Sequence, residues 1–197
     1  MRAVIVEMSE PELERRRKTG LDRLDEVWEG VSHMAPAPST EHQRIVGRLI
    51  ECLGPRLRES GRGTLLAQIS VFDEPSPTEN YRIPDLTFVA RERIEALVED
   101  GVRGGGPDAV IEVRSAGDET YEKLPFYAKV GTQEVVVIDR DTKRVEVFRL
   151  AGESFLAVSA DADGWVVSEV MGVELRGGEG GVLELVDRRE PGGSVTI

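Results

Sequence analysis

The most clearly periodic segment of the chain predicts a helix. From Ile45 to Leu57, apolar residues recur every three or four positions, which is typical of a helix with one buried face. Residues 40–43 match a capping box in which Thr40 is the N-cap residue and Gln43 reaches back to it, and Gly61 is expected to stop the helix. Gly54-Pro55 predict a kink or a break in its second half, because proline has no backbone N–H to donate.

Shorter apolar runs predict strands. Residues 108–114 and Glu134–Asp139 are apolar on both faces apart from a few charged positions, as in buried central strands. Leu86–Ala90 forms another such run, and residues 64–72 alternate with a period of two. Hairpins and weaker strands are expected over residues 25–34, 141–150, 154–159 and 165–171.

Three other segments, 11–18, 91–100 and 118–130, predict short helices, and residues 101–107 predict a glycine-rich connector. Gly131 is expected to cap the third of these helices. The order of strands, helices and hairpins predicts an α/β fold with a mixed β-sheet flanked by helices and additional N- and C-terminal antiparallel strands. We expect a single domain over residues 1–187 and a mobile tail over 188–197, where glycine and charged residues are frequent.

Composition restricts the possible partners. The chain has 197 residues with 25 Lys and Arg against 37 Asp and Glu, a net charge of −12, so bulk charge cannot attract nucleic acid. One basic series follows the long helix (Arg44, Arg48, Arg56, Arg58 and Arg62), and a solvated helix face explains it equally well.

The single cysteine, Cys52, excludes an intramolecular disulfide and a cysteine-rich zinc site. The first residues lack the apolar run of a signal peptide, and no run is long enough to span a bilayer. We therefore expect a cytoplasmic protein.

Two carboxylates stand where apolar strands do not ordinarily carry them. Glu112 lies inside a predicted central strand, and Asp85 follows Pro84 at the start of another. Arg114 shares a face with Glu112, and Lys123 begins the next predicted helix. Carboxylates with a cation beside them suit Mg²⁺, which prefers oxygen ligands, but a structural ion-pair cluster is an equally good interpretation.

The motifs around these residues resemble a known family. They are Trp28 to Pro36, Glu41-His42-Gln43, Pro84-Asp85, Pro107-Asp108 through Ile111-Glu112-Val113, Ser115, Glu122-Lys123 through Gly131, and Ile138-Asp139. In order and spacing they are similar to the Uma-type family of putative restriction endonucleases, within the PD-(D/E)XK nuclease superfamily. The resemblance covers about residues 20 to 175. It implies a restriction-endonuclease-like core with a divalent metal ion on the carboxylates.

The resemblance also implies roles for individual residues. Asp85 and Glu112 correspond to the metal-binding acids, and Glu41 resembles the extra acidic residue near the metal. Arg114 stands at the motif's lysine position, where a permanently charged guanidinium can stabilise charge but cannot act as a base. Lys123 is then the candidate for the catalytic lysine, and Gln68 is expected nearby.

We therefore expect a metal-dependent endonuclease that uses Mg²⁺ or Mn²⁺, with DNA as the substrate and a homodimer as the assembly. The catalytic residues would be Asp85, Glu112, Lys123 and Arg114. A catalytically inactive binding or interaction module of the same fold is the alternative, favoured by the acidic charge. Hydrolysis of a smaller phosphorylated substrate is a third interpretation, which no residue in the chain selects.

Overall fold

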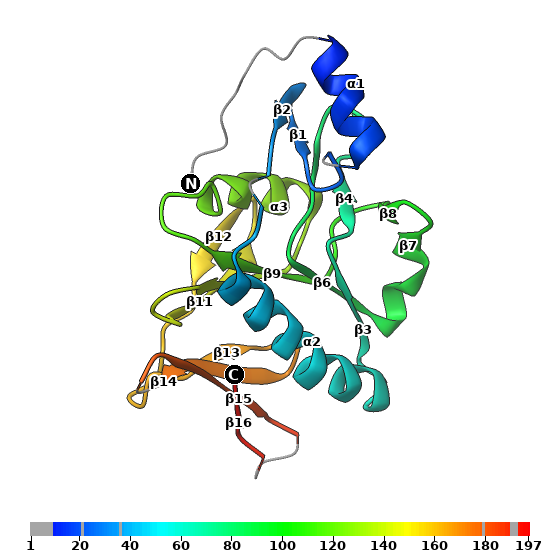
Figure 1. Ribbon diagram of the computed structural model, residues 1–197. Helices are drawn as coiled ribbons and strands as arrows, with labels where there is room; N and C mark the ends of the chain where they lie inside the picture. The colour runs from blue at the N-terminus through cyan, green and yellow to red at the C-terminus, as the bar shows by residue number, and fades with distance from the viewer. Residues whose placement is uncertain (1–9, 21, 36, 179, 190–192) are drawn as a thin grey trace.

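The computed structural model describes residues 10–20, 22–35, 37–178, 180–189 and 193–197, and these ranges contain three sheets with helices on their faces (Figure 1). The first residues, on which the expectation of no signal peptide rests, lie outside the described ranges. No helix in the described ranges combines the length and the apolar character that crossing a bilayer requires.

The central sheet has six strands in the order β12-β11-β10-β9-β6-β3. Their bounds are Ser154–Ala157, Val145–Ala151, Glu134–Asp139, Ala109–Arg114, Leu86–Ala90 and Gly63–Ala67. β9 and β10 run parallel, and the other neighbours are antiparallel, so the sheet is mixed. The two parallel strands lie in the middle, where burial on both faces explains their nearly continuous apolar sequences.

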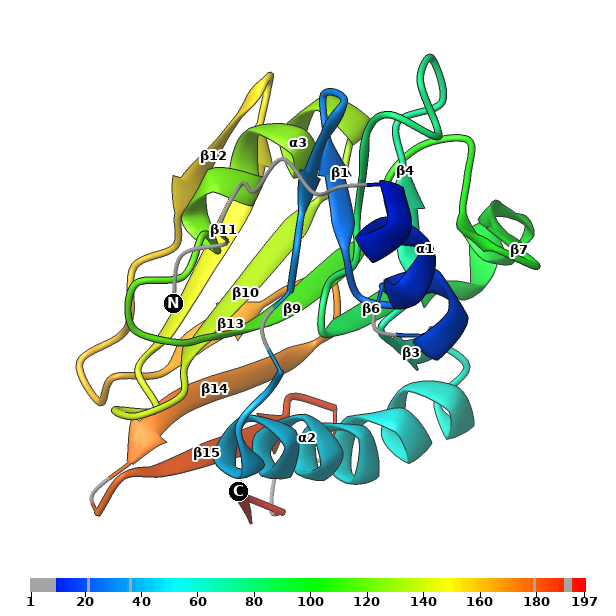
Figure 2. The same cartoon turned by 45° about the horizontal axis from the view of Figure 1, so that its top comes forward.

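Each face of the central sheet has its own hydrophobic core. The long helix α2 (Thr40–Glu59) covers one face together with the C-terminal sheet, and the short helix α3 (Leu124–Val130) lies on the other (Figure 2). Ile111 and Val113 point toward α2, whereas Val110 packs with the α3 side. The alternation of strand side chains therefore places Glu112 on the α3 face.

A second six-stranded sheet, in the order β2-β1-β5-β4-β8-β7, carries the N-terminal hairpin. Its strands span Val31–His33, Glu26–Trp28, Tyr81–Arg82, Ser70–Phe72, Gly101–Val102 and Leu97–Val98. Helix α1 (Glu10–Thr19) precedes the hairpin, and the 3-10 helix η1 (Arg91–Ala96) follows β6. A second 3-10 turn, η2 (Tyr121–Lys123), leads directly into α3.

The C-terminal sheet is antiparallel and consists of β13 (Val166–Ser168), β14 (Val173–Gly178), β15 (Val182–Asp187) and β16 (Val195–Thr196). Residues 193–197, part of the stretch for which we expect a mobile tail, contribute the last strand of this sheet. Strand β16 pairs with β15, and Ile197 is buried and exchanges backbone hydrogen bonds with Leu183. Burial of the last apolar side chain offsets the entropy of ordering this segment.

The predicted fold class is confirmed: the molecule is an α/β protein with mixed sheets flanked by helices and a C-terminal antiparallel sheet. The bounds of β6 and β10 agree with the sequence analysis. Gly131 caps α3 in the left-handed conformation, with φ of 85°.

The expected N-cap of α2 was wrong. Its N-cap is Ser39, not Thr40: Ser39 is extended, and its Oγ accepts a hydrogen bond from the His42 N–H at 3.2 Å. The helix is continuous through Pro55, so of the expected kink or break the break does not occur. Leu53 and Leu57 are fully buried on either side of Pro55, so packing against the sheet holds the helix together despite the missing donor.

Three other segments, each predicted as one or two elements, differ from the prediction in how they divide into strands and helices. Residues 64–72 form β3 and β4 in different sheets, because Gln68 has a φ of 51° and redirects the chain. Residues 91–102 form η1 followed by the β7-β8 hairpin, so the expected connector begins with a strand. The predicted helix over 118–130 begins only at Tyr121, as η2, and continues as α3.

Candidate active site

A cavity of about 400 Å³ opens beside the beginning of β6 and the end of β9. The β1-β2 hairpin, the first turn of α2 and the segment that leads into η2 also line it. The lining brings together four residues that the sequence singled out, Gln68, Asp85, Glu112 and Lys123. It also contains both histidines of the chain, His33 and His42.

Strand pairing brings the two candidate acids together. Leu86 of β6 lies opposite Ile111 of β9 in an antiparallel pair, so the next step along each strand places Asp85 beside Glu112. The backbone N–H of Val113 donates to Asp85 Oδ2 at 2.7 Å, which fixes that carboxylate against β9.

Glu112 is buried in the sheet, with its side chain 6% exposed, and has two donors from the following helical segment. The Tyr127 hydroxyl donates to Glu112 Oε1 at 2.6 Å, and Lys123 Nζ lies 3.3 Å from the same oxygen. Burial raises the pKa of Glu112, and the charge of Lys123 offsets only part of this effect.

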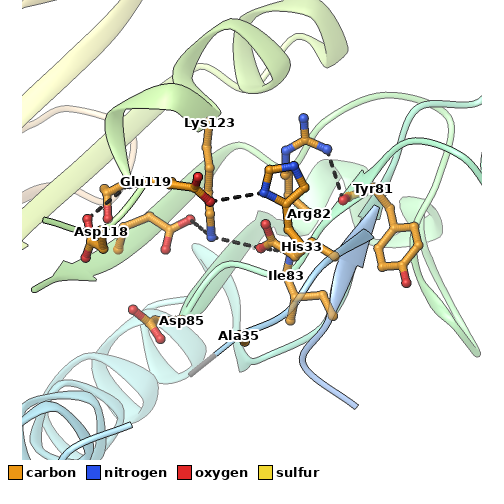
Figure 3. A network of polar contacts seen from close by, with 12 residues as sticks. His33, Ala35, Tyr81, Arg82, Ile83, Asp85, Asp118, Glu119 and Lys123 are labelled. Atoms are coloured by element: carbon orange, nitrogen blue, oxygen red, sulfur yellow. Dashed lines mark hydrogen bonds and ion pairs between the residues drawn. The ribbon is translucent and has the colours of Figure 1, made fainter. Parts of the chain in front are cut away.

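Lys123 lies between two carboxylates, as the dashed contacts at its tip in Figure 3 show. The nearer is Glu26 of β1, whose Oε1 lies 2.8 Å from Nζ, compared with 3.3 Å for Glu112. Burial alone would lower the pKa of Lys123, but attraction to Glu112 and Glu26 outweighs it, so the pKa is raised. Lys123 is therefore an ammonium ion in this arrangement.

His42 projects from the first turn of α2 into the cavity. Its Nε2 lies 3.1 Å from Asp85 Oδ2, and its Nδ1 is buried without a partner among the described residues. Burial alone would lower the pKa of His42, but the contact with Asp85 outweighs it and the pKa is raised. The sequence indicated only a capping position for this residue.

The structure places Arg114 and Glu41 away from the cavity lining. Arg114 Nη1 donates to Asp139 Oδ2 at 2.7 Å, and its guanidinium lies over the ring of Tyr121. Glu41 accepts hydrogen bonds from Arg44 and from the buried Lys143, and these lower its pKa to about 2. Neither residue contacts Asp85 or Glu112 through the described hydrogen bonds and ion pairs.

Asp85 and Glu112 fit a hard cation as a pair. Among the described contacts, Asp85 Oδ1 and Glu112 Oε2 accept no hydrogen bond, so each carboxylate has one oxygen available. No group of three or more His, Cys, Asp or Glu residues that could hold a metal ion occurs in the described part of the chain. Two carboxylates suit Mg²⁺ or Mn²⁺, because Mg²⁺ commonly keeps several water ligands.

Sequence reasoning assigned no role in the site to several polar residues of the lining, among them Glu26, His33, Glu119 and Arg140. His33 Nδ1 lies 3.0 Å from Glu119 Oε2, and Arg140 Nη1 donates to Ser115 Oγ at 3.2 Å. Glu26 and His33 come from a hairpin in the second sheet, so no local pattern places them beside the central strands. The only available signal was an acidic residue, Glu26, two positions before Trp28 in what becomes a three-residue strand.

Four of the five arginines in the basic series on α2 and just after it form hydrogen bonds or ion pairs within the chain. Arg44 pairs with Glu41 and Arg48 with Glu51, and Arg56 donates to the carbonyl of Cys52. Arg62 forms a buried ion pair with Asp187. These contacts favour the interpretation of a solvated, internally paired face.

Comparison with known proteins gives a consistent result. A family model described as "Putative restriction endonuclease" matches residues 12–177. A solved structure, described as a putative nuclease belonging to DUF820 from Anabaena variabilis, has 19% sequence identity and a TM-score of 0.59, and the match covers 75% of this chain and 82% of that chain. No curated protein matches. Because the family model spans most of the sequence, the chain belongs to the Uma2 family of putative restriction endonucleases.

Proposed function

We propose that this protein is a metal-dependent endonuclease that hydrolyses phosphodiester bonds in DNA. The observation that carries the proposal is the presence of Asp85, Glu112 and Lys123 in one cavity, although they come from three different elements. Membership of a family described as nucleases supports the reaction class. The fold similarity to a solved structure described as a putative nuclease supports the same architecture.

Each residue has a role that follows from its contacts. Asp85 and Glu112 would hold Mg²⁺ or Mn²⁺ through their available oxygens, and the bound ion would supply Lewis acidity and an activated water. Tyr127 and the Val113 N–H orient the two carboxylates. Lys123 brings a positive charge to the cavity, where it can stabilise negative charge that develops on a phosphate.

Arg114 is retained only as an electrostatic contributor outside the cavity, because Asp139 holds its guanidinium. Glu41 would be an indirect contributor through the first turn of α2. Two copies around a two-fold axis would place one site on each DNA strand, so a homodimer remains our expectation. Sedimentation of the purified protein with and without duplex DNA tests this assembly.

The proposal is tested by titrating Mg²⁺ and Mn²⁺ calorimetrically into wild type, Asp85→Asn and Glu112→Gln, with cleavage of supercoiled plasmid measured on the same preparations. We expect both acid variants to lose cation binding and cleavage. Glu153→Gln removes an exposed carboxylate outside the cavity and should behave as wild type.

Lys123→Met is expected to retain cation binding and to lose cleavage by about 100-fold or more, the usual scale for one electrostatic group. Cation binding without cleavage of plasmid or single-stranded DNA by the wild type would favour the inactive binding module. A folded wild type that binds neither cation would show that the carboxylates are structural.

A further inference from the structure

The β1-β2 hairpin is attached by two polar contacts to the segment between β9 and α3, which carries Lys123. The hairpin belongs to the second sheet, whereas Lys123 and Glu119 belong to the segment that leads from β9 to α3. Glu26 of β1 contacts Lys123. His33 of β2 contacts Glu119, as Figure 3 shows. The position of the candidate catalytic lysine therefore depends on an element outside the central sheet.

The carboxylate of Glu26 is oriented by two hydrogen-bond donors, a backbone N–H and an indole N–H. Its side chain is 8% exposed. The backbone N–H of Ile83 donates to Oε1 at 2.8 Å, and the indole N–H of Trp28 donates to Oε2 at 2.7 Å. The indole itself is stacked on the His33 ring, with 4.0 Å between the ring centroids. The carboxylate thus presents a fixed negative charge to Lys123.

We propose that Glu26 is a positioning residue for catalysis, which holds the Lys123 ammonium in the cavity and leaves Glu112 available to a divalent cation. Lys123 Nζ is closer to Glu26 than to Glu112, so its ion pair persists when Glu112 binds a cation. This inference rests on the proposed function. If Glu26 positions Lys123, the β1-β2 hairpin contributes to cleavage although it lies outside the central sheet.

The charges in the cavity agree with this assignment. Glu26, Asp85 and Glu112 are three carboxylates facing one ammonium, which leaves an excess of two negative charges when these four groups are ionised and the lining histidines, His33 and His42, are neutral. A divalent cation neutralises that excess. The other charged lining residues are engaged elsewhere: Asp118 with backbone N–H groups, Glu119 with His33, and Arg140 with Asp141.

The test compares Glu26→Gln with Glu29→Gln, each titrated with Mn²⁺ alone and then assayed for single-turnover plasmid cleavage at saturating Mn²⁺. Glu29 is exposed on the same hairpin and carries the same charge, but it has no described contact with Lys123. We expect E26Q to weaken Mn²⁺ binding and to slow cleavage by about 10- to 100-fold each, the usual effect of removing a group that supports a ligand. E29Q should stay within about twofold of wild type.

A double-mutant cycle shows whether Glu26 acts through Lys123. In a Lys123→Met background, E26Q should slow cleavage further by about twofold or less, because coupled residues are not additive. Full additivity, or an E26Q protein that binds and cleaves like E29Q, overturns the proposal. Glu26→Asp retains the charge but shortens the side chain, and it should give a smaller loss in the same direction if E26Q does not fold.

The two levels of failure are distinguishable. A wild type that neither binds Mn²⁺ nor cleaves DNA overturns the proposed function and this inference together. An active wild type with an unaffected E26Q overturns the role of Glu26 alone.

Discussion

A buried carboxylate in an apolar strand requires its own donors, and Glu112 has two of them from one helical segment. Tyr127 and Lys123 are four residues apart, so they lie on the same side of the η2-α3 segment and reach Glu112 together. Without these donors a charge at this position would be costly. The same contacts that allow Glu112 to be buried also orient it toward the cavity.

Tyr127→Phe removes one of these donors without changing the volume of the ring appreciably. We expect the free energy of unfolding to fall by about 1.5–3 kcal/mol, the usual value for a hydrogen bond to a charged group. Urea denaturation followed by circular dichroism measures it. Tyr81→Phe is the control, because no hydrogen bond of the Tyr81 hydroxyl to a described residue is present, and equal losses in both variants would contradict the assignment.

At the level of elements, the first turn of α2 decides where His42 points. Ser39 caps the helix through its side chain, and Lys143 binds Glu41 from the turn that follows β10. The helix is thereby fixed at its N-terminus as well as along its apolar face. His42 follows Glu41 directly and reaches Asp85 from this position.

The identity of the cap can be tested with two neighbouring substitutions. Ser39→Ala should destabilise the protein by about 1 kcal/mol, because the His42 N–H loses its acceptor. Thr40→Ala should change stability by less than about 0.5 kcal/mol, since Thr40 is already inside the helix. Thermal unfolding of both variants provides the measurement, and the reverse order would restore Thr40 as the cap.

The C-terminal sheet is joined to the turn between α2 and β3 by a buried ion pair between Arg62 and Asp187. The two side chains are 7% and 3% exposed, and Arg62 also donates to the carbonyl of Met171 at 2.6 Å. Burial alone would raise the pKa of Asp187, but hydrogen bonds from the Arg189 N–H and from Arg62 outweigh it, so the pKa is lowered. This pair connects the segment after α2 to β15.

Asp187→Asn should therefore destabilise the protein in a pH-dependent way. Because the folded-state pKa lies below the unfolded value, the stabilisation is complete above the ordinary carboxylate pKa of about 4 and is lost as the pH falls through the lowered folded value. We expect a loss of about 3 kcal/mol at pH 7 that shrinks in strong acid. Unfolding curves at several pH values measure this dependence.

The exposed ion pair of Glu169 with Arg188 provides the contrast for that experiment. Glu169→Gln should cost less than about 1 kcal/mol, because exposed pairs are screened by solvent. A loss at Asp187 that did not change with pH would contradict a charged pair.

At the scale of the whole molecule, a net charge of −12 opposes the approach of DNA. The paired arginines of α2 do not offset it. A divalent cation at Asp85 and Glu112 would therefore contribute to DNA binding as well as to chemistry. We expect Lys123→Met to bind labelled duplex DNA about tenfold more tightly with Mn²⁺ than with EDTA at constant ionic strength.

Fluorescence anisotropy measures that difference. Asp85→Asn in a Lys123→Met background should lose it, because one ligand of the cation is missing. Equal affinity with Mn²⁺ and with EDTA would show that DNA is bound elsewhere on the molecule.

The parts of the fold that were predicted correctly are those in which local pattern and final environment agree. β6 and β10 are buried on both faces and are accordingly apolar along nearly their whole length, and α2 has one buried face and a matching helical repeat of apolar residues. These three elements could therefore be recognised from the sequence. The break at Gln68 could not, because glutamine has no particular preference for a positive φ. The break lies there because β3 and β4 pair with strands of two different sheets.

The sequence by itself determined the class of the fold, and its motifs indicated Asp85, Glu112 and Lys123, because strand and helix periodicity and short motifs are local properties. The tertiary structure decided which side chains share the cavity. It brought in Glu26 and His42 and left out Arg114 and Glu41. The physical reason is that pairing between distant strands and the docking of a hairpin from another sheet set these distances, and neither is encoded in the spacing along one segment.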